Sequence, residues 1–218
     1  MSDVRRPVVA TVAAAVVAAV CLVGLSACQG EDDPAPAATP SETSTPLADF
    51  ATDALVVRRD SFCAGVDPAA TEEALGGEPD ASSSYDNGEP ARLTRGVQDV
   101  AHEFGCTWRR TDGSTARAWV FTPPVTAGRA RALARTTAST PGCSEVADAP
   151  AFGRPSAAVV CRADGTLEAS YRGLFGDAWL SCALAAPVSP ADRADLVDRA
   201  GRWCVAVATA ASGPDASG

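Results

Sequence analysis

The sequence predicts an α+β domain in which helices pack on one face of an antiparallel β-sheet and three disulfides join the elements. Segments that alternate apolar and polar side chains recur along the chain, as half-buried strands require. Asp112-Gly113 and Asp164-Gly165 separate such segments and are typical of hairpin turns. The chain after residue 50 also holds six cysteines, an even number that fits three disulfides.

The first part of the domain is expected to hold a strand, a helix and a loop. Ala54–Val57 is apolar enough to form a short strand. Asp67 and Pro68 are typical of the N-cap and the first residue of a helix, which Gly76-Gly77 would end. From 76 to 99 the chain is polar, so we expect a long loop that is either a lid or disordered. Its composition favours disorder.

A hairpin and a second helix are expected next. Val100–Arg110 alternates, and its core-facing side would carry His102, Phe104, Cys106 and Trp108. Thr115–Thr122 would form the returning strand after the Asp-Gly turn. The helix is expected over Ala127–Ala138, with Thr126 as its N-cap.

The rest of the chain is expected to add three strands and a last helix, which completes the order β-α-ββ-α-βββ-α. The strands are predicted at Ala157–Ala163, Thr166–Leu174 and Ala178–Ala185. Ser189-Pro190 is typical of a helix start. The apolar stripe of that helix continues to about Ala210.

The N-terminal segment has the layout of an export signal. Arg5 and Arg6 precede Val8–Leu25, a run without charged residues, and Leu25-Ser26-Ala27-Cys28 reads as a lipobox. We therefore expect residues 1–27 to be a lipoprotein signal peptide. Cys28 would carry the acyl chains that hold the protein on the outer side of the cell membrane. The alternative is that Val8–Leu25 remains as a membrane anchor; either interpretation places the folded part where disulfides persist.

Composition divides the remaining chain and excludes some functions. Residues 28–48 are rich in Pro, Ser, Thr and acidic residues and predict a disordered linker. Residues 49–211 would form the extracytoplasmic domain, and 212–218 a flexible tail. The net charge of −9 argues against nucleic acid and anionic lipid headgroups as partners. All basic residues are Arg, so Schiff-base chemistry by lysine is excluded.

Few side chains are candidates for chemistry. His102 is the only histidine, and no motif supplies a nucleophile or a metal-binding partner for it. We therefore expect a structural or incidental role for His102, no cofactor, no metal and no enzymatic activity. Asp86, Asn87 and Glu89 could offer oxygens to Ca²⁺, but they lack the spacing of a recognised calcium loop. A solvated acidic loop is expected there instead.

Trp119 and Phe121 form a candidate binding surface. They share one face of an expected strand, opposite Val120. Such residues can line a ligand groove or a partner interface. They can also be covered by a helix as part of the core, which is the commoner arrangement.

One pattern in the first half is similar to a known group of proteins. Cys63, the short helix that ends in Leu75-Gly76-Gly77, and Cys106-Thr107-Trp108 together resemble actinobacterial cell-envelope lipoproteins of unknown function. The resemblance covers the lipobox and residues 58–122. It implies an extracytoplasmic α+β domain in which Cys63 is bonded to Cys106. It brings no catalytic residues.

The sequence alone leaves the pairing of six cysteines open. Beyond the pair that the resemblance implies, Cys182 shares a strand face with two leucines, and Cys204 lies on the apolar stripe of the last helix. These two are therefore expected to pair. Cys143–Cys161 is the pair that remains.

These observations predict a lipid-anchored extracytoplasmic protein that binds or senses a small ligand or another exported protein without catalysis. The alternative is an accessory lipoprotein that scaffolds an envelope complex, and an enzyme ranks third. A cavity between sheet and helices would favour a ligand, whereas an exposed aromatic patch would favour a protein partner.

Overall fold

The computed structural model describes residues 44–94, 97–163, 165–188 and 192–213. The predicted signal peptide, Cys28, most of the predicted linker, the Ser189-Pro190 helix start and residues 214–218 of the predicted tail lie outside the described residues. Within the described part, no helix is both long and apolar enough to cross a bilayer.

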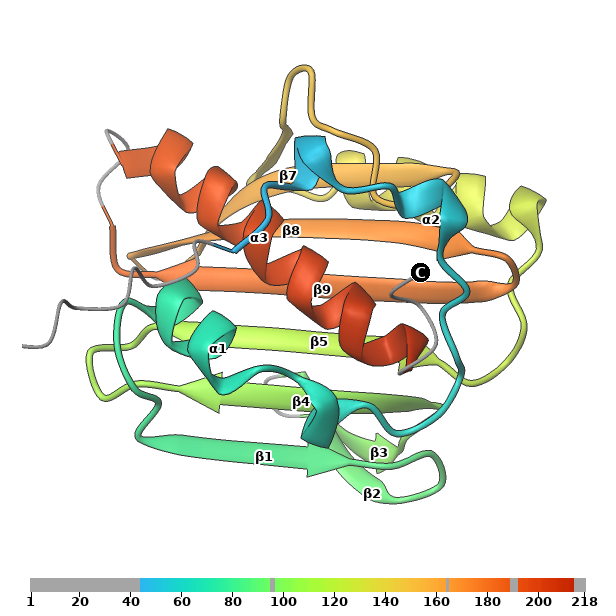
Figure 1. Ribbon diagram of the computed structural model, residues 1–218, viewed down its shortest axis with the longest axis horizontal. Coiled ribbons are helices and arrows are strands. Elements are labelled where there is room, and N and C mark those ends of the chain that lie inside the picture. Colours follow the sequence, from blue (N-terminus) through green and yellow to red (C-terminus); the bar gives the residue numbers. More distant parts are fainter. Residues whose placement is uncertain (1–43, 95–96, 164, 189–191, 214–218) are drawn as a thin grey trace, which may run out of the picture. The chain divides into compact units, whose positions relative to one another are not determined.

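The described strands form a seven-stranded antiparallel sheet and a separate hairpin (Figure 1). From one edge to the other, the sheet holds β1 (Ala81–Tyr85), β4 (Glu103–Arg109), β5 (Thr115–Phe121), β9 (Ala178–Ala186), β8 (Thr166–Phe175), β7 (Ser156–Ala163) and β6 (Cys143–Glu145). The hairpin consists of β2 (Pro90–Thr94) and β3 (Val97–Val100). The α-helices are α1 (Pro68–Leu75), α2 (Ala127–Ala138) and α3 (Arg193–Ser212), and 3-10 turns occupy Leu47–Asp49, Thr52–Ala54 and Cys63–Gly65.

Helices cover both faces of the sheet, so the expectation that they all pack on one face is wrong. Val120 belongs to the core cluster beneath α3, whereas its neighbour Phe121 belongs to a second cluster beneath α2. In Figure 1, α1 and α3 lie in front of the sheet and α2 lies behind it. The physical reason is strand β9, which is buried at every position and therefore needs a cover on both faces.

The main core lies between the sheet and α3. Trp203 of α3 meets Trp108 of β4 edge to face, with ring centroids 5.2 Å apart. Leu47 is also buried in this core, so the folded part begins before Asp49, within the predicted linker. Gly201 of α3 makes room for it, because a Cβ at this position would lie 3.3 Å from the Leu47 Cβ.

The predicted helix ends are confirmed by their hydrogen bonds. The Asp67 carboxylate accepts from the backbone N–H of Ala69 at 2.9 Å, and Gly76 ends α1 in the left-handed conformation with φ of 72°. The Thr126 hydroxyl accepts from the backbone N–H of Arg129 at 3.2 Å and so caps α2. The predicted strands of the second half are found within a residue or so at each end.

Two short elements differ from expectation. Ala54–Val57 is not a strand: it follows a 3-10 turn, and the next backbone N–H, that of Arg58, donates to the Ala211 carbonyl at the end of α3. The chain here packs against a helix end instead of a strand. The three residues of β6 are an additional strand, too short to show a period of two.

The segment from 76 to 99 is the largest correction, because it forms strands where disorder was expected. Tyr85 of β1 lies opposite Gly105 of β4, and a Cβ on Gly105 would lie 2.2 Å from the Tyr85 ring. The ring therefore crosses β4 at a residue without a side chain. Its hydroxyl donates to the Glu103 carboxylate at 2.6 Å. Backbone pairing and the Tyr85 contacts order this polar segment. Its low apolar content therefore did not indicate disorder.

The described cysteines form three disulfides with the expected pairing: Cys63–Cys106, Cys143–Cys161 and Cys182–Cys204. The last joins β9 to α3 through two cysteines that are fully buried. Cys143 and Cys161 are instead cross-strand partners at the sheet edge formed by β6 and β7.

Removing the disulfide between β9 and α3 should destabilise the fold more than removing the one at the sheet edge. The two pairs close loops of similar size, with sequence separations of 22 and 18. The chain-entropy contribution is therefore about 3 kcal/mol for each. Only the Cys182→Ala/Cys204→Ala variant also leaves a cavity in the core. Urea unfolding of this variant and of Cys143→Ala/Cys161→Ala compares the losses, and an equal or larger loss at the edge would contradict the prediction.

Glu103→Gln should remove part of the pH dependence of stability. Burial raises the pKa of the Glu103 carboxyl above its ordinary value, against the opposing effect of the Tyr85 hydrogen bond. The folded chain therefore holds this proton more tightly than the unfolded chain does. The free energy of unfolding falls as the pH rises from the ordinary glutamate pKa through the raised one. Glutamine keeps an acceptor for the Tyr85 hydroxyl and carries no charge, so the variant should gain stability over the wild type across this range.

Thermal unfolding at a series of pH values measures this difference. Glu78→Gln, at an exposed position, is the matched control for the loss of one carboxylate. Parallel curves for Glu103→Gln and the wild type would show that burial of the Glu103 charge does not affect stability.

Candidate functional site

The predicted binding surface is divided between two environments. Phe121 packs with Leu174, Trp179 and side chains of α2 in the second apolar cluster. Trp119 remains half-buried, and the guanidinium carbon of Arg172 lies 5.8 Å from its ring centroid. Phe121 therefore packs against this cluster while Trp119 lies outside it, and both side chains are half-buried.

Arg172 contacts both Trp119 of β5 and Thr137 of α2. One guanidinium nitrogen donates to the Thr137 hydroxyl of α2 at 3.1 Å. Trp119, Ser181 and Arg172 are adjacent across β5, β9 and β8. The Arg172 Nε and the hydroxyls of Ser170 and Ser181 are buried and lack hydrogen-bond partners among the described residues. Burial also lowers the pKa of Arg172. Of these groups, Arg172 reaches α2 directly through its bond to Thr137.

α2 is a basic helix in an acidic chain. It contains Arg129, Arg131 and Arg135 and no acidic residue, whereas the whole chain has a net charge of −9. Ala130 and Thr137 are buried against the sheet, and the three arginines are exposed. None of the three takes part in an ion pair within the described residues.

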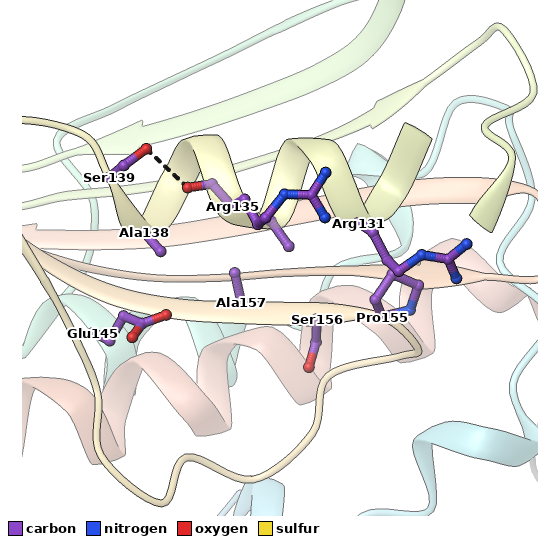
Figure 2. A pocket seen from close by; sticks show the side chains of 9 residues that line it. Arg131, Arg135, Ala138, Ser139, Glu145, Pro155, Ser156 and Ala157 are labelled. Carbon is purple, nitrogen blue, oxygen red and sulfur yellow. Dashed lines mark hydrogen bonds between the residues drawn. The ribbon is translucent and has the colours of Figure 1, made fainter. Parts of the chain in front are cut away.

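Arg131 and Arg135 border a cavity of about 480 Å³ between α2 and the start of β7 (Figure 2). Figure 2 shows both arginines on the helix wall, and Ala138 of α2 facing Ala157 of β7 across the cavity. Glu145 of β6 lies on the strand wall. Small side chains along both walls leave the open space.

A second cavity, of about 500 Å³, continues the first along the sheet edge. It shares Glu145, Ser156 and Ala157 with the first cavity and extends along 146–150. We refer to the two together as the α2–β7 groove. Its charged side chains are Arg131, Arg135, Glu145 and Asp148, and no described ion pair joins either carboxylate to either arginine. The groove can therefore supply charge to a bound molecule.

The other candidate residues lie apart from the groove lining. His102 is exposed in a bend before β4, where its carbonyl accepts from the Thr122 N–H at 3.0 Å. The prediction that it faces the core is wrong, because β4 begins one residue later, at Glu103. The Glu89 carboxylate accepts from the backbone N–H of Asp86 within its own turn. In the described part of the chain, no three His, Cys, Asp or Glu side chains gather as a metal-ligand set.

The sequence predicts α2 but not the groove beside it. Three arginines without an acidic residue, in a helix of a chain with excess acidic residues, were the available signal. The opposite wall had no comparable signal, because it depends on β6 and on the packing of α2 against the second face of the sheet.

The comparisons with known proteins do not identify the chain. No protein-family model matches it, and a search of curated proteins found no significant match.

Proposed function

We propose that this chain is a lipid-anchored extracytoplasmic protein that binds a partner through the α2–β7 groove, without catalysis. The observation that carries the proposal is the pair Arg131 and Arg135, exposed at a groove and without an ion-pair partner among the described residues. Unpaired guanidinium groups at a concave site favour an anionic ligand. The lipobox that ends at Cys28 supports the location, and three disulfides fit an oxidising compartment.

The lining of the groove supports binding without chemistry. Its described residues include no His and no Cys. The Ser139 hydroxyl already donates to backbone carbonyls of α2, at 2.9 and 3.2 Å. A serine nucleophile would need a neighbouring base, and no described hydrogen bond joins a serine hydroxyl of the groove to its carboxylates, Glu145 and Asp148.

An accessory scaffold lipoprotein is the second candidate. The observation that favours it is the β2–β3 hairpin, where Val97 and Val100 are 49% and 45% exposed. Exposed apolar side chains of this kind suit contact with another protein.

Changing Cys28 to Ala should release the protein from the membrane fraction or leave it unprocessed, because the variant has no thiol to acylate. Cell fractionation and intact-mass measurement test this. Cys21→Ala, a cysteine loss within the predicted signal peptide, is the matched control and should leave a normal lipidated product. A mature wild-type chain that begins elsewhere and carries no lipid would contradict the proposal.

A photoreactive amino acid placed at Ser139, in the groove, should crosslink to a partner in intact cells. The same substitution at Ser83, exposed on β1 at the opposite edge of the sheet, is the control and should not give this adduct. The adduct should disappear when Arg131 and Arg135 are both changed to Ala. Its mass separates a small ligand from a protein partner. Equal labelling from both positions, or an adduct that ignores the arginines, would count against the groove.

A further inference from the structure

We infer that the α2–β7 groove binds an extended acidic peptide segment of another protein, which adds as a strand to the open edge of β7. This inference names the ligand class of the site and therefore rests on the proposed function. It draws on the backbone of β7, on the spacing of the two arginines and on the position of Glu145.

The outer edge of β7 is only partly covered. β6 pairs with β7 as far as Val159, and the Val146 N–H then donates to the Ala158 carbonyl at 3.0 Å. The Pro155 carbonyl points the other way and accepts a hydrogen bond from β8. Because backbone groups alternate between the two sides of a strand, Ser156 directs its N–H and carbonyl to the outer edge. No described backbone group is bonded to them there. An unpaired edge of this kind is a template for an added strand.

The groove gives a peptide access to this edge. Figure 2 shows the Ala157 side chain pointing toward α2 and the Ser156 side chain pointing away from it. Ser156 therefore meets the groove chiefly through its backbone. On the helix wall, Ala134 and Ala138 are small enough to let another backbone lie close.

The two arginines match the geometry of an extended chain. They are four residues apart on α2, which places their Cβ atoms about 6 Å from each other. Alternate side chains on one face of a strand are about 7 Å apart. Acidic residues at positions i and i+2 of a bound strand would therefore reach Arg131 and Arg135 together. Each guanidinium can donate two hydrogen bonds to one carboxylate.

Glu145 restricts how such a peptide lies. Glu145 lies opposite Val159 and therefore shares the sheet face on which Ala157 points toward α2. Asp148 also lines the groove. An acidic side chain beside either carboxylate would meet a like charge. The favoured ligand therefore places its carboxylates beside the two arginines of α2 and small neutral side chains elsewhere. A sequence that alternates acidic and small residues can fulfil this condition.

The test uses the full-length chain in detergent and two labelled eight-residue peptides, one of alternating Glu and Ala and one of alternating Lys and Ala. Fluorescence anisotropy should show binding of the acidic peptide and not of the basic one. Arg131→Ala/Arg135→Ala should weaken binding about tenfold or more, the loss expected for a charge-assisted hydrogen bond. Arg129→Ala, on the same helix but outside the groove lining, should leave affinity unchanged. Glu145→Gln should strengthen binding.

Backbone pairing has a separate test. Two versions of the acidic peptide are N-methylated at alternate amides, one in each register. The version whose methylated amides face β7 should bind about tenfold more weakly, because N-methylation removes its donors to the β7 edge, whereas the other version keeps them. Binding of both versions as tight as that of the unmethylated peptide would overturn strand addition. An acidic peptide that fails to bind, or that loses as much affinity with Arg129→Ala as with the double variant, would overturn the ligand class.

The two proposals fail differently. If the Ser139 crosslink forms and depends on the arginines while the acidic peptide does not bind, the ligand class is wrong and the groove remains a binding site. If the arginine-dependent crosslink is also absent, the proposed function itself fails. All the variants named here change exposed side chains, so their melting temperatures should match that of the wild type, which checks that the fold is intact.

Discussion

The fold depends on strand β9, which runs through the sheet and is buried at each of its positions. α3 covers one of its faces and is bonded to it by Cys182–Cys204. The other face carries Trp179, which would be in water without the cluster beneath α2. α2 therefore lies where apolar burial requires a cover. The groove beside it lies where α2 passes over the start of β7, because the small side chains of Ala134, Ala138 and Ala157 leave space there.

The same packing leaves the outer face of α2 free for charge. Ala130 and Thr137 occupy the buried side of α2, so arginines on the opposite side do not place charge in the core. The bond from Arg172 to Thr137 fixes the rotation of the helix about its axis. Arg131 and Arg135 consequently border the groove, while Arg129 does not. Trp119, predicted as a binding residue, lies beneath the Arg172 guanidinium.

How far the sequence predicts this structure depends on whether the relevant interactions are local. Local signals located helices and strands correctly. These signals are the helix caps Asp67 and Thr126 and the alternation in β4 and β5. β1 depends on Tyr85 crossing Gly105, a pairing between residues far apart in sequence that no local pattern reveals. The groove could not be predicted for the same reason. Its walls come from α2 and β7, which are separate in sequence and lie together only in the folded sheet.

The contrast between the acidic chain and its basic helix has a consequence for recognition. A net charge of −9 repels an acidic partner at long range, whereas Arg131 and Arg135 attract it only at contact. Salt screens both effects, but the long-range repulsion is screened first. An acidic segment that does not fit the groove is repelled by the net negative charge of the chain and gains no ion pair with Arg131 or Arg135. The overall charge therefore acts against non-specific acidic partners, and affinity depends on a segment that places its carboxylates on the two arginines.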